Sequence, residues 1–182
     1  MLRKLLILFI VCIHYTCSAQ IFEVQQGYVR FYSQAKQELI KASTAALKGV
    51  VDLKKKTFVF KVVNSTFAGF NSPLQQEHFN EDYMESDIFP ESYFTGKIIE
   101  DVDVTKSGEY KVRAKGKLKV HGIEQERIID VKVKSVPGKL IIQCLFNISL
   151  ADHNIKIPKV VYDKLAPVIQ VTVAASLQQR DR

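Results

Sequence analysis

Four histidines and a group of acidic residues are the side chains in this sequence best suited to metal or acid–base chemistry. His78 and Asp82 stand four residues apart, which places both on one face of a helix, and Glu77, Glu81 and Glu85 lie nearby in the chain. Imidazole and carboxylate groups are both zinc ligands. However, no second histidine falls at ligand spacing and no cysteine joins the group. The sequence therefore predicts a solvated acidic helix face and no metal site.

His121 and His153 are the other candidates for proton transfer. His153 follows Asp152, but a carboxylate next to a histidine in the chain is weak evidence for a general base. No Gly-x-Ser-x-Gly elbow or cysteine–histidine arrangement supplies a nucleophile. His121 directly precedes Gly122, which favours a place in a turn. We therefore predict that the protein is not an enzyme, and a small hydrolase or isomerase using His78, His121 or His153 is the weaker alternative.

The N-terminal residues 1–19 have the layout of a secretory signal peptide. Arg3 and Lys4 precede an apolar run over residues 5–13, and small residues then lead to Ala19. Cleavage after Ala19 would leave a single domain over residues 20–182 and predicts a periplasmic or secreted protein. The alternative, a lipoprotein anchored at Cys17, fits less well because the usual leucine and small-residue pattern does not precede Cys17.

Cleavage would leave a chain with one cysteine and a moderate positive charge. Removing Arg3 and Lys4 lowers the formal charge from +7 to +5. Cys12 and Cys17 also leave with the signal peptide, so Cys144 has no partner for an internal disulfide. The fold must therefore be stabilised by its core, and a chain of this size can build one. No later segment approaches the roughly 18 apolar residues that a membrane-spanning helix needs.

The clearest structural pattern in the chain is a two-residue alternation over residues 109–122. In an extended strand, successive side chains point to opposite faces of the sheet. The solvent-exposed face would carry Glu109, Lys111, Arg113, Lys115, Lys117 and Lys119. The buried face would carry Tyr110, Val112, Ala114, Gly116, Leu118 and Val120. Ala114 and Gly116 are small, so they either let another element pack closely or border a hollow.

Alternating segments of this kind account for most of the chain after residue 20. They lie at residues 21–33, 47–53, 57–63, 93–100, 109–122, 124–136, 139–150 and 168–177. Turn signals separate the later segments into antiparallel hairpins. About eight strands with short turns favour a closed antiparallel barrel over a sandwich, because closure removes the sheet edges. Residues 34–43 contain helix formers and are expected to form a helical turn or a loop, although their flanks are strand-like.

One segment breaks the strand pattern and predicts a helix over residues 73–86. Ser72 is suited to be its N-cap, Pro73 its first helical residue, and Gln75 the side chain that bonds back to the start of the helix. Pro90 stops any continuation. The expected fold is therefore mainly β, an eight-stranded antiparallel barrel with one helix packed between strands.

A spaced set of residues covers most of the chain after residue 20. It comprises Phe67-x-Gly69-Phe70, His78-Phe79-Asn80, Tyr83-Met84-Glu85-Ser86, Phe89-Pro90, Phe94-x-Gly96, Gly108-x-Tyr110 and Gly116-x-Leu118-x-Val120-His121-Gly122. This set resembles the YceI-like family of lipid- and polyisoprenoid-binding proteins. The resemblance implies a lipocalin-like, elongated eight-stranded barrel whose interior holds an apolar chain, which in family members is an isoprenoid lipid or a quinone-like tail. It also agrees with export to the periplasm.

Apolar residues that face inward in such a barrel are the candidate lining of a lipid-binding cavity. They are Phe58, Phe60, Phe67, Phe70, Phe79, Tyr110, Val112, Ala114, Gly116, Leu118 and Phe146. Each could instead be ordinary core in a collapsed barrel, because most apolar residues are simply packed. We predict an exported protein without an enzymatic cofactor that carries or sequesters an apolar or amphiphilic lipid. The alternative is an envelope stress or interaction protein with a filled barrel.

The basic face of residues 109–122 raises the question of a charged partner. Lys132 and Lys134 extend this face on the next predicted strand. No aromatic residues are interleaved with these lysines, so no nucleic-acid partner is predicted. A solvated barrel exterior explains the face better than peripheral contact with anionic lipid headgroups, which is the second interpretation.

Overall fold

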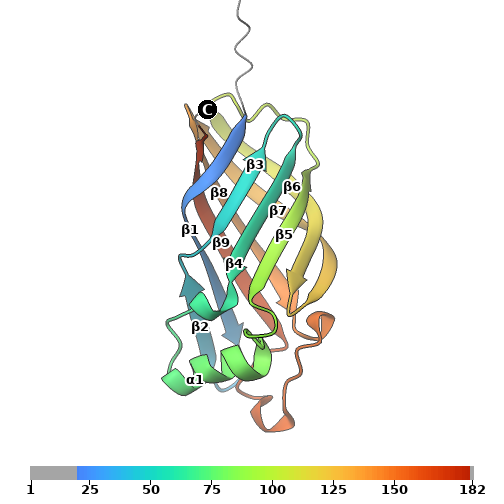
Figure 1. Cartoon of the computed structure of the whole chain (residues 1–182). Coiled ribbons are helices and arrows are strands. Elements are labelled where there is room, and N and C mark those ends of the chain that lie inside the picture. The colour runs from blue at the N-terminus through green and yellow to red at the C-terminus, as the bar shows by residue number, and fades with distance from the viewer. Residues whose placement is uncertain (1–19, 181–182) are drawn as a thin grey trace, which may run out of the picture.

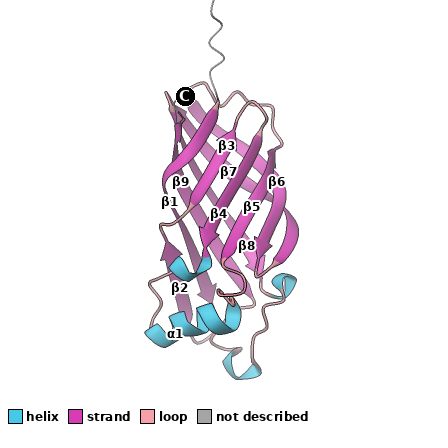
Figure 2. Cartoon of the chain, viewed as in Figure 1, coloured by secondary structure: helices cyan, strands magenta, loops and turns pink. Residues whose placement is uncertain are grey.

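The computed structural model describes residues 20–180 as antiparallel strands that wrap into a barrel, with one helix lying across one end (Figures 1 and 2). The predicted signal peptide lies outside the described residues. The strands are β1 (Ile21–Gln34), β2 (Leu39–Thr44), β3 (Lys48–Asp52), β4 (Thr57–Val63), β5 (Glu91–Ile98), β6 (Gly108–Val120), β7 (Ile123–Val136), β8 (Lys139–Ser149) and β9 (Val168–Gln179). None of the helices within residues 20–180 is long and apolar enough to cross a membrane.

Strand β1 closes the barrel. It pairs along most of its length with β9, the last strand within residues 20–180, through the register Phe22↔Gln179 to Tyr32↔Gln170. On its other side the first residues of β1 pair with β3, and its last residues pair with β2. Strands β3 to β9 follow one another around the wall in chain order. The prediction of an eight-stranded antiparallel barrel is therefore confirmed, with β2 as an additional strand.

Residues 34–43 were expected to form a helical turn or a loop, and this expectation is correct for residues 35–38 and wrong for the others. Leu39–Thr44 is strand β2, which pairs antiparallel with residues Val29–Gln34 of β1. Helix propensity is a weak local preference, and here the backbone hydrogen bonds to β1 outweigh it. The consequence is that the end of β1 has a pairing partner where β3 no longer reaches.

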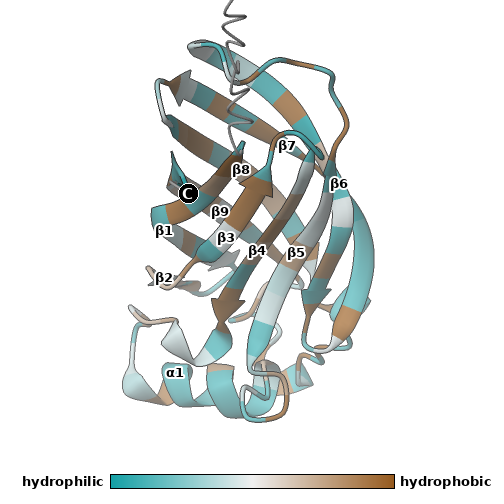
Figure 3. Cartoon of the chain, turned by 45° about the horizontal axis from the view of Figure 1, so that its top comes forward, coloured by the Kyte–Doolittle hydropathy of each residue, from teal (hydrophilic) through white to brown (hydrophobic). Residues whose placement is uncertain are grey.

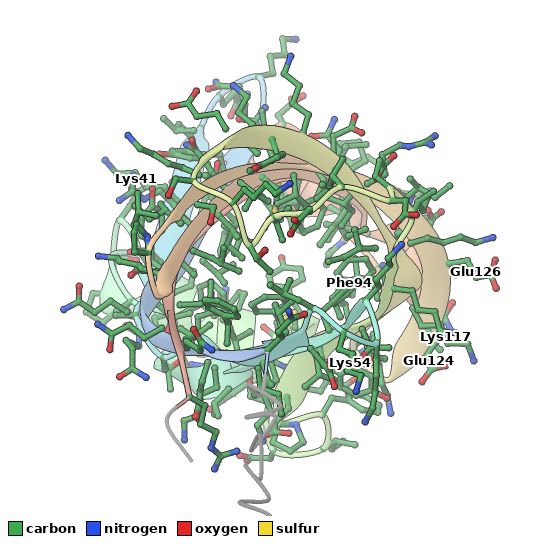
Figure 4. The ribbon with its side chains drawn as sticks, turned by 90° about the horizontal axis from the view of Figure 1, so that it is seen from above. Lys41, Lys54, Phe94, Lys117, Glu124 and Glu126 are labelled. Atoms are coloured by element: carbon green, nitrogen blue, oxygen red, sulfur yellow. The ribbon has the colours of Figure 1, made fainter. Side chains whose placement is uncertain are left out.

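The alternation of residue types places apolar side chains inside the barrel and charged side chains outside. Hydrophobic and hydrophilic residues alternate along the strands in Figure 3. In Figure 4 the labelled side chain of Phe94 points into the barrel, whereas those of Lys117 and Glu124 point outward. The outward pair forms an ion pair between neighbouring strands, with Lys117 Nζ 3.2 Å from Glu124 Oε2. The core and any cavity must therefore lie within the wall.

Two glycines opposite each other bring β5 and β6 into close approach. Gly96 pairs with Gly116 in the register of the two strands. A Cβ atom at Gly116 would overlap the backbone of Thr95, and one at Gly96 would overlap the backbone of Lys115. The small residue at position 116 thus serves close packing between strands, which is the first of the two roles that the sequence allowed.

Helix α1 (Pro73–His78) begins as the sequence predicts but is shorter. Ser72 Oγ accepts a hydrogen bond from the backbone N–H of Gln75 at 3.2 Å, and Gln75 Oε1 accepts one from Asn71 N at 3.1 Å. A π-helical turn over Phe79–Tyr83 extends α1, and regular structure then ends. Glu85 adopts a φ of 43°, a left-handed conformation that cannot continue a right-handed helix, so the predicted end at residue 86 is wrong.

Candidate functional site

The interior of the barrel is a cavity of about 600 Å³ whose wall is almost entirely apolar. This volume lies within the range of roughly 300 to 1,000 Å³ that is typical of small-molecule and cofactor sites. Ordinary packing voids are far smaller, since a buried water needs only about 10 to 15 Å³. The barrel is therefore hollow, and the alternative of a filled barrel is wrong for this chain.

Most of the predicted lining residues reach this cavity. Nine of them contribute to its wall: Phe58, Phe60, Phe67, Phe70, Phe79, Val112, Ala114, Leu118 and Phe146. Ala114 is buried in the wall between Val112 and Leu118, where its small side chain leaves room on the inner face. The alternation of strands thus identifies the inner surface, and the role of each residue toward a ligand stays a prediction.

Tyr110 and Gly116 do not line the cavity, and these two assignments are wrong. The hydroxyl of Tyr110 donates a hydrogen bond to the backbone oxygen of Lys106 at 2.9 Å, which directs its ring toward the loop between β5 and β6. Gly116 packs against the backbone of β5. Both residues are on the inward-facing side of β6. However, Tyr110 packs against the β5–β6 loop and Gly116 against the backbone of β5, so neither contacts the cavity.

Four phenylalanine rings form a cluster where the cavity approaches α1. Phe31 stacks on Phe79 with ring centroids 5.5 Å apart and an angle of 18° between the rings. Phe67 and Phe70 contact both of these rings, at centroid distances between 5.1 and 5.9 Å. Sequence reasoning missed Phe31, although it alternates with polar neighbours in the first strand.

The two ends of the cavity differ. At the end away from α1, the loop between β5 and β6 turns Val104 inward, where this residue is buried and lines the cavity (Figure 1). At the α1 end, the cavity wall includes the exposed side chains of Leu74, His78 and Lys164. Lys61 of β4 is an exposed wall residue as well, but its amine forms an ion pair with Glu91 at 2.6 Å, so the group of exposed wall residues at the α1 end marks the place where the cavity meets solvent. The mouth of the cavity therefore lies at the α1 end, between Leu74 and His78 on one side and Lys164 on the other.

Hydrogen bonds tie together the segments around the mouth. Glu38, which lines the cavity, accepts hydrogen bonds from Gln75 Nε2 at 2.6 Å and from Asn71 Nδ2 at 3.2 Å. Gln37 N donates to the backbone oxygen of Asp163 at 2.8 Å. The turn before β2, the first turn of α1 and the segment around residue 163 therefore form one connected rim. Sequence reasoning missed Glu38 and Lys164, because they are brought together only by barrel closure.

Several residues that carry the family resemblance meet beside the mouth and not inside the cavity. His121 Nε2 lies 2.6 Å from Glu85 Oε2, and its Nδ1 lies 2.9 Å from the backbone oxygen of His153. The ring of Phe89 packs edge-on against His121 at 4.7 Å. Gly122 has a φ of 74°, and a Cβ atom there would meet the Phe89 ring at 2.6 Å. This cluster fixes the β6–β7 turn to the end of the helical segment, so these residues have a structural role.

The histidines and acids form neither a catalytic cluster nor a metal site in the described part of the chain. His78 borders the mouth, whereas His121 and His153 lie outside the cavity wall. Burial lowers the pKa of His153 from its ordinary value of 6.5, partly offset by hydrogen bonds to the Ile123 and Val120 carbonyls. Within residues 20–180, no three His, Cys, Asp or Glu side chains are grouped so that they could hold a metal ion.

Cys144 lines the cavity with a partly buried thiol. Burial in apolar surroundings raises its pKa to about 11, since a thiolate would lose the hydration that stabilises its charge. A thiol with this pKa is a poor nucleophile at neutral pH. Cys144 therefore acts as one more apolar wall residue.

The fold is shared with solved structures of low sequence identity. A polyisoprenoid-binding domain from Saccharophagus degradans is 12% identical, has a TM-score of 0.75, and matches over 90% of this chain and 100% of that one. BcnA from Burkholderia cenocepacia is 13% identical, with a TM-score of 0.68 over 82% of this chain and 95% of that one. A YceI protein from Campylobacter jejuni is 13% identical, with a TM-score of 0.57 over 69% and 74% of the two chains.

The sequence itself matches one family profile. Among curated proteins no sequence matches the chain significantly. The profile of the YceI-like domain matches residues 20–177, which run from the start of β1 into β9 and include the whole cavity wall. The chain therefore belongs to the YceI-like domain family.

Proposed function

We propose that this protein binds an apolar or amphiphilic lipid inside the barrel and carries or sequesters it without changing it chemically. The observation that carries the proposal is the cavity of about 600 Å³ with an apolar wall and a mouth at one end. The YceI-like fold, which the chain shares with a polyisoprenoid-binding domain, supports the same conclusion.

The physical basis of binding would be the removal of an apolar chain from water. Each buried methylene contributes about 0.8 kcal/mol, so a tail of ten carbons gains about 8 kcal/mol before the costs of ordering it. The wall contributes many rings and branched aliphatic side chains but few polar groups that could select one head group. The cavity thus suits a long unbranched or isoprenoid tail, including that of a quinone.

The proposed place of action rests on the sequence of residues 1–19. Residues 1–19 have the layout of a signal peptide, so the binding protein would work in the periplasm or outside the cell. Lipids with long tails have very low concentrations in water there. A protein that encloses the tail would therefore keep such a lipid dispersed between membranes or away from unwanted partners.

The proposal is tested by native mass spectrometry of the protein as isolated, together with solvent extraction of the same sample. A bound lipid in near-stoichiometric amount is expected. Ala114→Phe, which fills part of the inner face, should lower lipid content, whereas Lys115→Phe, one residue along on the outer face, should leave it unchanged. Protein that contains no lipid, and that takes up none of a quinone or isoprenoid alcohol offered in detergent, would overturn the proposal.

A further inference from the structure

The end of the barrel that carries the mouth also carries exposed apolar side chains. We define these as the apolar rim: Leu39, Leu74, Val160 and Tyr162. The exposed fraction is 87% for Val160, 59% for Tyr162 and 57% for Leu74. Figures 1 and 2 place α1 and the segment of residues 159–165 at the same end of the barrel. Val160 is the most exposed large apolar residue within residues 20–180, and apolar side chains exposed beside a cavity entrance indicate a surface that meets an apolar partner.

The rim is continuous with the cavity. Leu74 lines the cavity mouth, and Val161, which lies between Val160 and Tyr162, also lines it. The hydrogen bonds from Gln37 to Asp163 hold the 159–165 segment against the turn before β2, at 2.8 Å for the backbone pair. A molecule that lies against the apolar rim would therefore also lie against the entrance to the barrel.

The charges next to Val160 and Tyr162 are mainly positive. Lys36, Lys159 and Lys164 are all exposed on the segments that form the rim. The acids on these segments are Glu38 and Asp163, and both accept hydrogen bonds, from Gln75 and from Gln37. The helical segment has acids of its own, Glu77, Glu81 and Asp82. These stand on the helical segment, which borders the mouth on the side opposite the segment of residues 159–165.

We infer that the apolar rim docks on the surface of an anionic phospholipid bilayer, with Val160 and Tyr162 inserted among the lipids and Lys36, Lys159 and Lys164 beside the headgroups. Tyrosine and aliphatic residues flanked by lysine are the composition of membrane-interface surfaces. Each lysine near an anionic surface contributes about 1 kcal/mol. The partner is therefore identified by its chemistry as a sheet of negative headgroups over hydrocarbon.

This inference rests on the proposed lipid-binding function and explains how the cavity would be loaded. A tail that crossed water between the bilayer and the barrel would lose about 0.8 kcal/mol for each exposed methylene. A mouth pressed into the headgroup layer lets the tail pass directly from hydrocarbon to the apolar wall. The docking surface differs from the basic face of β6, which lies along the barrel wall.

The absence of tryptophan from the sequence allows a direct test. In Tyr162→Trp, the single indole reports whether this side chain enters a bilayer. We expect a blue shift of its emission on adding vesicles of phosphatidylcholine with phosphatidylglycerol, and quenching by brominated lipid chains. Val59→Trp, on the outer wall of β4, is the matched control and should show neither change. An emission spectrum of Tyr162→Trp that does not change on adding vesicles would overturn the inference. A blue shift that appears without vesicles and grows with protein concentration would also overturn it, because it would report contact with a second copy of the protein.

Vesicle flotation measures the same docking with variants. Val160→Asp should weaken binding by about tenfold, because a valine side chain is lost from the apolar layer. Ile128→Asp, on the wall of β7 with an exposed fraction of 57%, should bind as the unchanged protein does. Lys159→Gln and Lys164→Gln should each weaken binding by about fivefold on anionic vesicles, and Lys54→Gln at the opposite end should not. Equal losses for the rim and wall variants would contradict the inference.

Lipid content measured on the same preparations separates the proposed carrier function from the proposed docking on a bilayer. Protein that contains lipid but does not bind anionic vesicles at low salt would refute docking and leave the carrier function intact. Protein that binds vesicles through the rim but never holds lipid would refute the carrier function.

Discussion

The imidazole of His121 lies against the carboxylate of Glu85, with Nε2 and Oε2 2.6 Å apart. Both residues have positive φ values, 48° for His121 and 43° for Glu85, which are unusual for residues with side chains. Their contact joins the β6–β7 turn to the end of the helical segment at the mouth of the cavity. Met84, the residue before Glu85, is buried and lines the cavity. The contact therefore holds part of the cavity wall in place.

His121→Ala should lower the free energy of unfolding by about 1 to 2 kcal/mol, because it removes two hydrogen bonds from a largely buried ring. Urea unfolding followed by circular dichroism measures this change. Glu81→Gln, on the exposed face of the helical segment, is the control and should change stability by less than about 0.5 kcal/mol. A His121→Ala variant as stable as the unchanged protein would show that the contact does not support the fold.

His153 should make the protein less stable in mild acid. Burial lowers the pKa of His153 below its ordinary value of 6.5, so the unfolded chain binds a proton more readily than the folded chain. Its contribution to stability is therefore complete above about pH 6.5 and is lost as the pH falls. His153→Gln should show a smaller loss of unfolding free energy between about pH 7 and pH 5. Parallel pH profiles for the two proteins would contradict this prediction.

Cys144 should resist thiol reagents in the folded protein. With a pKa of about 11, only about one thousandth of the thiol is ionised near pH 8. Ellman's reagent should therefore react slowly with native protein and rapidly in guanidinium chloride. The control is Gln143→Cys, whose new thiol would lie on the exposed outer face of β8 and should react at once. Rapid reaction of native Cys144 would mean that reagents pass freely through the mouth.

Gly116→Ala should destabilise the barrel wall and not merely narrow the cavity. Its Cβ atom would overlap the backbone of β5, and overpacking of this kind typically costs about 1 to 3 kcal/mol. Gly108→Ala, where a Cβ atom would meet the Tyr110 hydroxyl and ring at 3.3 to 3.4 Å and no backbone atom within that distance, should cost less. Thermal unfolding of the two variants measures the difference. A Gly116→Ala variant of unchanged stability but reduced lipid content would contradict this prediction and show that Gly116 lines the cavity.

The sequence predicts most of the wall because burial on one face imposes a period of two. Strand β4 has the bounds expected for it, and Val112, Ala114 and Leu118 face inward as the alternation requires. The period does not show how far a side chain reaches, so Tyr110 and Gly116 were assigned to the cavity lining although local contacts take up their space. It also cannot show the mouth, since Glu38 and Lys164 are far apart in the chain and meet the cavity only after closure.

The β1–β9 seam decides when the protein can first hold a lipid. Within residues 20–180, β1 and β9 are the first and last strands and complete the wall together, so a nascent chain that lacks β9 has an open sheet and no enclosed hollow. Contacts between distant parts of a chain form slowly. The proposed lipid uptake would therefore follow completion of β9, and a truncation within β9 should abolish retention even where the other strands still form.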